Sequence, residues 1–256
     1  MAHTRALVRP PASTFADGLT RSDEGPPDIG LALDQHRAYC QALEECGLEV
    51  TALPADPGFP DSTFVEDAAI VTEQGAIAMR PGAPSRAGEV EGVVAALRSY
   101  FREVAQIFAP GTVDGGDVCE VDSHFLIGLS ARTNEQGARQ LARLLGDMQY
   151  KSSIVDIRGS RLLHLKTGLA YLGTGCVAVT HELAREPALN RYEKIPVQAD
   201  ERYAANCIRV NDYVLVASGY PKIADQLAAR RYHVKPVEMS EFRKMDGGLS
   251  CLSLRF

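Results

Sequence analysis

The sequence has no long hydrophobic run. No segment approaches the roughly 20 apolar residues that a membrane-spanning helix needs, and the N-terminus lacks the apolar stretch of a secretory signal. We therefore expect a cytoplasmic protein. Positive charge is also scarce, because Lys and Arg number 27 against 33 Asp and Glu, for a net charge of −6. This balance argues against a general grip on nucleic acid and mildly favours cationic ligands.

Cysteines at metal-binding spacing are absent as well. The six cysteines are scattered and no Cys-x-x-Cys occurs, so a structural zinc site is not expected, and the cysteines should be free thiols in a reducing compartment. Neither a Gly-x-Gly-x-x-Gly nor a Walker pattern is found, which removes the usual phosphate-binding loops. We expect no metal and no cofactor.

No linker or low-complexity segment divides the chain. Residues 1–256 are therefore expected to form a single catalytic domain of ordinary composition, with 45% hydrophobic and 23% charged residues. The softest stretch is 18–30, which is rich in Gly and Pro. A loop of that length in a compact protein is either a functional lid or simply mobile, and both interpretations stay open.

Hairpin signals recur along the chain. They come at intervals of roughly 40–50 residues, a spacing that is typical of repeat architectures. The paired strands are predicted at 68–72 with 76–80, 117–121 with 125–129, 168–172 with 176–180, and 206–210 with 213–217. Helical patterns lie around them at 33–43, at 90–101, at 133–145, where a capping box at 133–136 opens the pattern, and more weakly at 223–227.

The two ends of the chain complete the repeat. The first strand pattern, 5–9, and the last, 249–256, each lack a neighbouring partner, and pairing them would remove two exposed edges. We infer an α/β fold, a closed five-bladed propeller of ββαβ-type repeats. In such a ring the segments that enter the hairpins converge near the axis. These segments are 64–67, 114–117, 164–167, 204–206 and 247–251.

Three converging segments carry the parts of a cysteine hydrolase. Cys251 follows Asp-Gly-Gly-x-Ser and is the candidate nucleophile. His164 is the candidate acid/base, and Asp114 could orient it as a carboxylate does in a catalytic triad. Taken singly, a buried core thiol, a core histidine and an Asp-Gly turn are the commoner explanations. Their shared position in the repeat is what favours catalysis.

Acidic and basic residues at other equivalent points indicate a cationic amino-acid substrate. Asp61, Glu66 and Asp67 crowd one apolar stretch, and carboxylates suit the fixed donor fork of a guanidinium. Arg86 and Arg132 could hold an α-carboxylate. A solvated acidic loop and surface ion pairs are the alternatives for these residues.

At these residues the chain closely resembles the dimethylarginine dimethylaminohydrolase family of the pentein (amidinotransferase-fold) superfamily. The matching segments span nearly the whole chain. They are 17–20 (Asp-Gly-Leu-Thr), 59–67 (Phe-Pro-Asp-Ser-Thr-Phe-Val-Glu-Asp), 80–86 (Arg-Pro-Gly-Ala-Pro-Ser-Arg), 114–117 (Asp-Gly-Gly-Asp), 131–134 (Ala-Arg-Thr-Asn), 163–166 (Leu-His-Leu-Lys), 204–207 (Ala-Ala-Asn-Cys) and 246–251 (Asp-Gly-Gly-Leu-Ser-Cys).

The resemblance implies a five-bladed α/β propeller and a metal-free hydrolase. It would convert Nω-methylated arginines, asymmetric dimethylarginine and monomethylarginine, to citrulline and dimethylamine or methylamine through a covalent cysteine intermediate. Carried over by position, the resemblance gives Cys251 as nucleophile, His164 as general acid/base, Asp114 as its partner, Asp67 and Glu66 for the guanidinium, Asp61 and the Leu19 backbone for the α-amino group, Arg86 and Arg132 for the α-carboxylate, and Met245 at the pocket border.

Other assignments remain open at this point. Arginine deiminases and amidinotransferases share the Cys-His-acid set, although they are usually longer. A non-catalytic binding propeller would have no evident use for that set. A zinc hydrolase would need a spacing of metal ligands that this chain lacks. Some bacterial relatives carry Glu where this chain has Asp114, and the shorter acid is expected to reach His164. Residues 21–28 diverge from the family pattern, so the preferred methylarginine stays open. Assembly into a homodimer also stays open.

Overall fold

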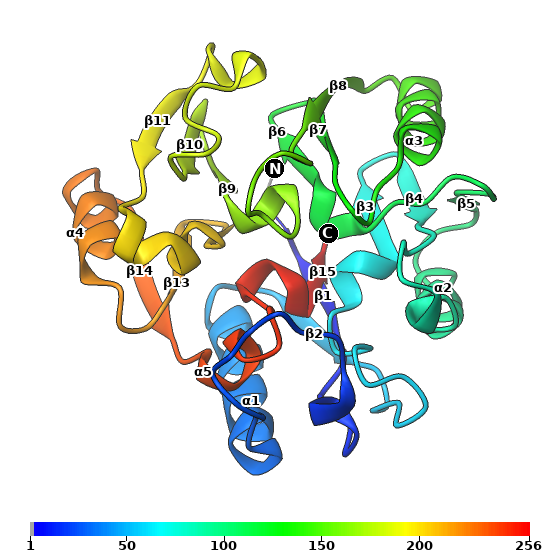
Figure 1. Ribbon diagram of the computed structural model, residues 1–256, viewed down its shortest axis with the longest axis horizontal. Helices are drawn as coiled ribbons and strands as arrows, with labels where there is room; N and C mark the ends of the chain where they lie inside the picture. Colours follow the sequence, from blue (N-terminus) through cyan, green and yellow to red (C-terminus); the bar gives the residue numbers. More distant parts are fainter. Residues whose placement is uncertain (1–2) are drawn as a thin grey trace.

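Five three-stranded sheets surround a common axis in the computed structural model, which describes residues 3–256 (Figure 1). In each sheet the middle strand pairs antiparallel with an inner strand and parallel with an outer one. The inner strands are β3 (Ala69–Thr72), β6 (Val118–Val121), β9 (Leu169–Gly173), β12 (Ile208–Val210) and β15 (Ser253–Arg255). The middle strands are β1 (Arg5–Val8), β4 (Gly75–Ala78), β7 (His124–Leu129), β10 (Cys176–Val179) and β13 (Tyr213–Ala217). The outer strands are β2 (Glu49–Ala52), β5 (Val104–Gln106), β8 (Lys151–Asp156), β11 (Glu193–Pro196) and β14 (His233–Val237).

Helices provide the crossovers that parallel strand pairs require. They are α1 (Ile29–Glu45), α2 (Glu89–Leu97), α3 (Glu135–Asp147) and α4 (Pro221–Ala229). The short α5 (Ser240–Arg243) instead joins β14 of one sheet to β15 of another. The blade of β9, β10 and β11 has no crossover helix, because the chain passes from β10 to β11 through only a 3-10 turn at 187–189. The predicted propeller of ββαβ-type repeats is confirmed, with this exception in its helices.

Helix starts follow capping chemistry. The carboxylate of Asp28 accepts the backbone N–H of Leu31 at the start of α1, which ends the loop at 18–28. At α3 the cap is Asn134, whose side chain accepts the N–H of Gly137. The N-cap is therefore one residue later than the predicted Thr133, because the Thr133 hydroxyl donates to buried Asp117 at 2.7 Å.

The two termini close the ring as expected. β15 pairs antiparallel with β1, with Ala6 opposite Arg255 and Val8 opposite Ser253. The final strand is shorter than the predicted 249–256, because Leu249–Leu252 form a 3-10 turn, η8, before β15 begins. Cys251 therefore lies on a turn rather than at the opening of a strand.

The core is divided into five apolar clusters, each lying between two neighbouring blades. Strand alternation sends successive residues of a middle strand to opposite faces of its sheet. On β4, Ala76 packs toward the sheet of β1 and Ile77 toward the sheet of β7. On β13, Val214 and Leu215 separate in the same way. Both faces of every sheet are thus buried, which fixes the blades around the axis.

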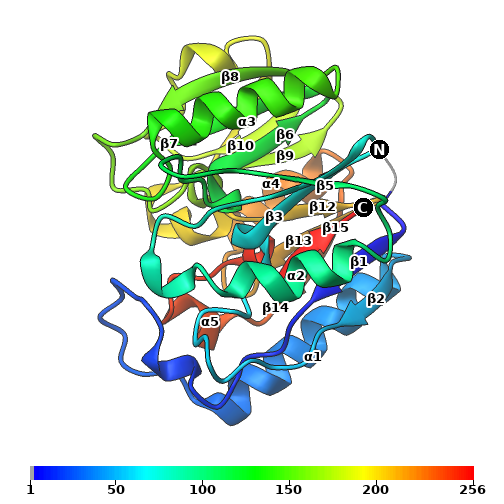
Figure 2. The ribbon, with the colours of Figure 1, turned by 90° about the vertical axis from the view of Figure 1, so that its right-hand side faces the viewer.

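A 3-10 turn precedes every inner strand. These turns are η2 (Val65–Ala68), η4 (Gly115–Asp117), η5 (Leu165–Thr167), η7 (Ala199–Ala205) and η8. In side view the loop at 18–28 and α5 lie at one end of the propeller and both chain ends lie at the other (Figure 2). The converging segments predicted from the sequence are these turns and the residues that flank them.

No helix within residues 3–256 combines the length and apolar character needed to cross a bilayer.

Tyr39 ties α1 to the segment that carries Cys251. Its buried hydroxyl donates to the carbonyl of Leu249 at 2.9 Å and shares a hydrogen bond with Ser253 at 2.6 Å. We expect Tyr39→Phe to lower the free energy of unfolding by about 1–2 kcal/mol, because buried partners lose their hydrogen bond. Urea denaturation measures the change.

Tyr150→Phe is the matched control for this substitution. The Tyr150 hydroxyl is buried and has no hydrogen-bond partner among the described residues, so its loss should change the unfolding free energy by less than about 0.5 kcal/mol. Equal effects of the two substitutions would contradict the role given to Tyr39.

Candidate active site

Glycines allow the turns to pack closely at the axis. A Cβ on Gly115 would lie 2.0 Å from the carbonyl oxygen of Glu66, and a Cβ on Gly116 would lie 2.8 Å from Nδ1 of His164. Any larger residue would force η2 and η4 apart. The Asp-Gly-Gly-Asp motif is therefore a requirement of close approach and not only a favourable turn.

His164 is paired with Asp114 by its Nε2 atom. The distance from Nε2 to Oδ2 of Asp114 is 3.1 Å, and both residues are buried. The other oxygen of Asp114 accepts the backbone N–H of Gly82 at 2.7 Å, so the carboxylate is fixed in place. The shorter acid thus reaches the ring, and Nδ1 is the nitrogen left to exchange a proton with a substrate.

The carboxylates around His164 favour its charged form. Burial would lower the pKa of His164, but the charges of Asp67, Asp117 and Asp114 outweigh it and raise that pKa to about 9. His164 is therefore an imidazolium at neutral pH. It can donate a proton to a leaving group before it acts as a base.

Cys251 has the opposite character. Its thiol is partly buried beside the Gly248 N–H, which donates to the sulfur at 3.4 Å. Burial and the charges of Glu66 and Asp67 raise the pKa of Cys251 to about 12. Without a further cation nearby, the sulfur is a thiol at neutral pH. Four of the other five cysteines are buried, and Cys40 is partly buried on α1.

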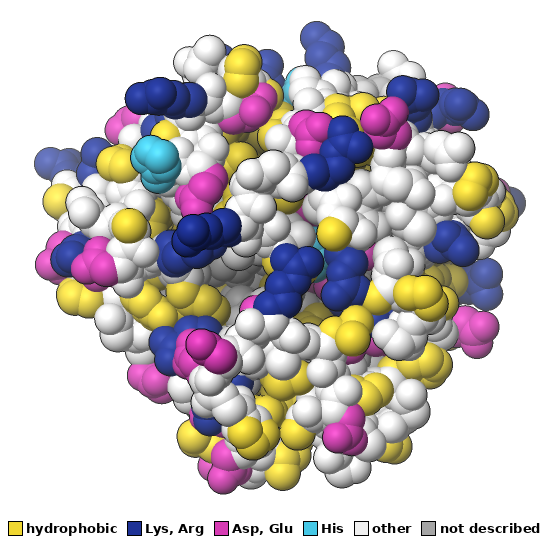
Figure 3. Space-filling model, in the orientation of Figure 1, with side chains coloured by type: hydrophobic (Ala, Val, Ile, Leu, Met, Phe, Trp, Pro, Cys, Tyr) yellow, Lys and Arg dark blue, Asp and Glu magenta, His cyan; other side chains and the backbone are white. Residues whose placement is uncertain are grey.

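Cys251 and His164 face one small cavity. It has a volume of about 30 Å³ and is lined by Glu66, Lys166 and Asn206 as well. On the face of the molecule that looks toward the viewer in Figure 1, Lys and Arg side chains gather around the centre (Figure 3). The acids Glu66 and Asp67 are 4% exposed.

Arg86 lies behind Asp67 in a buried ion-pair network. Its guanidinium is 2.6 Å from Oδ2 of Asp67 and donates to both oxygens of Glu89 at 2.8 to 3.2 Å. Burial opposes the charge of Asp67, but His164 and Arg86 lower its pKa to about 2. Arg86 is 5% exposed and is not among the residues lining the small cavity. Its proposed contact with an α-carboxylate stays a prediction.

Asp61 holds the loop at 18–28 against the site. Both of its oxygens accept the backbone N–H of Leu19, at 3.0 and 3.2 Å. Burial raises the pKa of Asp61, although the charges of Arg86 and Arg132 partly offset this. A Cβ on Gly18 would lie 3.2 Å from the end of Met245. The structure thus brings Leu19, Asp61 and Met245 together, while Arg132 is partly exposed.

Sequence reasoning missed a second polar network around Glu66. Lys166 lies 2.5 Å from Oε1 of Glu66, and the Ser250 hydroxyl donates to Oε2 at 2.7 Å. Asn206 donates to the Lys166 carbonyl and to Ser250 Oγ, both at 2.9 Å. All three residues stand within or beside the quoted motifs, but their side-chain directions could not be read from the sequence.

Asp67, Asp114 and His164 have ligand atoms within 4.8 Å of one another, a spacing that could hold a metal ion. Each carboxylate already accepts hydrogen bonds from the protein. Asp67 accepts from Arg86 and from the Gly116 N–H, and Asp114 accepts from Gly82 and contacts His164. The cluster is satisfied by these donors.

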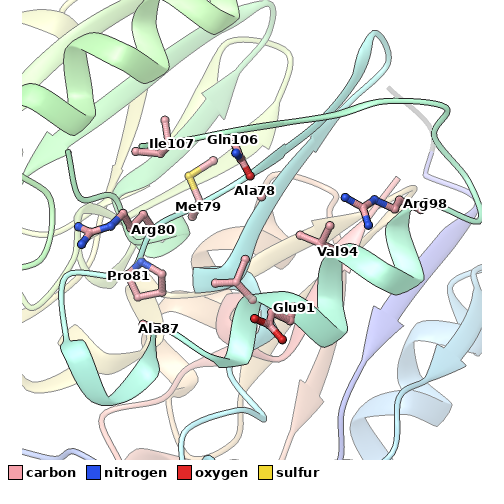
Figure 4. Close-up of a pocket in the computed structure, with 11 residues that line it drawn as sticks. Ala78, Met79, Arg80, Pro81, Ala87, Glu91, Val94, Arg98, Gln106 and Ile107 are labelled. Carbon is pink, nitrogen blue, oxygen red and sulfur yellow. The ribbon is translucent and has the colours of Figure 1, made fainter. Parts of the chain in front are cut away.

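A larger cavity of about 470 Å³ lies elsewhere, between α2 and the ends of β4 and β5. Arg80 and Arg98 lie at opposite ends of it, with apolar side chains such as Met79 and Val94 between them (Figure 4). None of the proposed catalytic residues lines this cavity. Size alone would therefore point to the wrong place for chemistry.

No family model matches the chain. Curated proteins that it resembles include the N(G),N(G)-dimethylarginine dimethylaminohydrolase of Pseudomonas aeruginosa, 45% identical over 98% of both chains. The enzyme of the same name from Streptomyces coelicolor is 35% identical over 100% of this chain and 98% of that one.

Solved structures agree with these relatives. A mutant of the Pseudomonas aeruginosa enzyme with serine in place of a cysteine, complexed with citrulline, has a TM-score of 0.98 at 44% identity and full coverage of both chains. The N-terminal domain of ArgZ, a cyanobacterial arginine dihydrolase, has a TM-score of 0.86 at 20% identity, covering 99% of this chain and 97% of that one. The second likeness supports the fold alone.

The acidic surroundings of His164 give a measurable pH effect. We expect an NMR titration of the His164 ring to give a pKa near 9. Asp114→Asn removes one carboxylate, so the imidazolium loses stabilisation and the pKa should fall toward the ordinary 6.5. Asp212→Asn, in the exposed turn between β12 and β13, is the control and should leave the titration unchanged. An unchanged pKa in Asp114→Asn would refute this electrostatic account.

The buried network of Arg86 predicts a large effect on stability. Arg86→Met would leave Asp67 and Glu89 buried without their cation, and we expect the unfolding free energy to fall by about 3–5 kcal/mol. Arg98→Met is the control, because Arg98 is exposed at the C-cap of α2, and should change it by less than about 0.5 kcal/mol. Chemical denaturation followed by circular dichroism measures both, and similar values for the two variants would argue against a structural network.

Proposed function

Because the chain belongs to the dimethylarginine dimethylaminohydrolase family, we propose that it hydrolyses Nω-methylated arginines to citrulline and dimethylamine or methylamine. The observation that carries this function is the convergence of Cys251, His164 and Glu66 on one cavity. A thiol, an imidazolium and a carboxylate are the groups needed to attack, protonate and hold a cationic planar carbon.

The charges around the cavity support one binding direction. The methylated guanidinium would lie against Glu66 and Asp67, and the α-amino group would approach Asp61 and the backbone of Leu19. The α-carboxylate would then meet Arg132, with Arg86 closer to Asp67. Each end of the substrate thereby faces a side chain of opposite charge, which fixes its orientation.

Substrate charge would activate the sulfur. The acids that raise the pKa of Cys251 are the ones that a guanidinium neutralises, so binding should lower that pKa and favour the thiolate. The thiolate would attack the guanidinium carbon, forming a carbon–sulfur bond. His164, already protonated, would give its proton to the nitrogen of the departing amine as the carbon–nitrogen bond breaks.

Neutral His164 would then serve as the base of the second half-reaction. It would take a proton from water as the water oxygen attacks the carbon of the cysteine adduct. Expulsion of the thiolate and loss of one proton release citrulline. Asp114 holds Nε2, so Nδ1 would transfer the proton in both directions. General acid–base catalysis of this kind contributes roughly 10²–10⁴-fold in rate.

Cellular location, domain organisation and the class of ligand are further parts of this proposal. We propose a single catalytic domain in the cytoplasm, supported by six free thiols, which oxidising compartments seldom leave unpaired. A small cationic amino acid is the ligand we propose. No contact with nucleic acid or membrane is expected from the net charge of −6.

Citrulline release from asymmetric dimethylarginine, monomethylarginine and arginine, measured side by side, tests the function. We expect turnover of both methylated substrates and little from arginine. Cys251→Ser should lower kcat by about 10³-fold or more, because the nucleophile is lost. Circular dichroism should show an unchanged fold.

Cys40→Ser is the matched control, since Cys40 is the other cysteine that is partly rather than fully buried. Its activity should stay within about twofold of the parent, in line with a small structural effect. Faster ammonia release from arginine than amine release from the methylated substrates would replace this function with that of an arginine deiminase.

A further inference from the structure

Lys166 supplies the cation that faces Glu66 in this structure. Its Nζ atom lies 2.5 Å from Oε1, and the two side chains are 17% and 5% exposed. The other oxygen of Glu66 accepts the Ser250 hydroxyl at 2.7 Å. An incoming guanidinium therefore meets a carboxylate whose two oxygens already have donors.

The backbone of Lys166 is fixed, but its ammonium is held only by its ion pair with Glu66. Asn206 donates to the Lys166 carbonyl at 2.9 Å and also bonds Ser250, which anchors η5 against η8. Among residues 3–256, Glu66 is the only side chain with which the Lys166 ammonium forms an ion pair. A lysine has a flexible four-carbon stem, so the ammonium can leave Glu66 without a change in the backbone.

The Lys166 ammonium stands where a guanidinium would contact Glu66. Glu66, His164, Lys166 and Cys251 line one cavity of about 30 Å³, and Nζ of Lys166 is in contact with Oε1 of Glu66. A guanidinium that pairs with that oxygen must therefore displace the ammonium. Lys166 is the flexible member of that lining and carries the same charge as the incoming group.

We propose that Lys166 is a specificity-determining residue that competes with ligands for Glu66 and moves aside when a guanidinium binds. This inference rests on the proposed function, because it takes a methylated guanidinium as the ligand. A guanidinium has donors in a planar fork and can contact Glu66 and Asp67 together. A ligand ammonium offers only what Lys166 already provides from a tethered position of high effective concentration. Amino acids that end in an amine are thereby disfavoured.

Chemical labelling tests the movement directly. The Cys251→Ser variant would be treated with an amine-acetylating reagent with and without asymmetric dimethylarginine, and acetylation of Lys166 measured by mass spectrometry. We expect a several-fold increase on binding, because the ammonium is released from Glu66. Lys222, which pairs with Asp200 on the surface, is the internal control. Unchanged or reduced labelling of Lys166 would overturn the proposal.

Two substitutions test the competition. L-lysine places its amine as many bonds from Cα as the guanidinium carbon of arginine. In Lys166→Met, we expect the inhibition constant of L-lysine to fall by about tenfold, a typical coupling between two ligands. The KM for dimethylarginine should fall less, because a guanidinium already displaces the Lys166 ammonium from Glu66. Lys166→Arg keeps a tethered cation and should retain weak inhibition.

These outcomes separate the inference from the function on which it rests. An inhibition constant for L-lysine that is unchanged or higher in Lys166→Met would refute the competition while leaving citrulline formation intact. Absence of citrulline from the unaltered protein would refute the proposed function itself.

Discussion

The site depends on a balance of buried charge around the propeller axis. Glu66, Asp67 and Asp114 are buried within one small region, and carboxylates that lose their water must gain cations or hydrogen bonds. Arg86 supplies the cation for Asp67, and Lys166 supplies it for Glu66. The imidazolium of His164 serves Asp114. Each of these carboxylates thus has a cation inside the protein, and a cationic ligand would have to share or replace one of them.

The fold makes this balance attainable because it delivers every charged group on the same kind of element. Each inner strand is preceded by a 3-10 turn, and these turns contact one another, η2 with η8 and η4, and η5 with η4 and η7. Gly115 and Gly116 let the turns approach within hydrogen-bond range. The apolar clusters lie between the blades, while the turns that contact one another carry Glu66, Asp67 and Lys166.

Periodic features of the sequence predicted most of this architecture. Hairpin signals, helical stripes and the unpaired first and last strands were sufficient for a ring of five blades, and β1 pairs with β15 as expected. The exact ends of elements depended on tertiary contacts. Thr133 does not cap α3 as predicted, because its hydroxyl donates to Asp117. Leu249–Leu252, predicted as part of the last strand, form a 3-10 turn. Likewise the motifs located Arg86 and Glu66, but only the packed structure shows that Arg86 faces Glu89 and that Lys166 meets Glu66.

The same balance explains why the Cys251 thiol stays protonated in an acidic pocket. Glu66 and Asp67 raise the pKa of Cys251 and the carboxylates near His164 raise the pKa of its ring, so the pair rests as thiol and imidazolium. A neutral ligand would change neither state. A cationic planar head would offset the acids next to the sulfur, while Asp114 and Asp117 would still favour the protonated form of His164 for the departing amine. Binding and activation are then one electrostatic event, and selectivity for a cation follows from the charges that hold the site together.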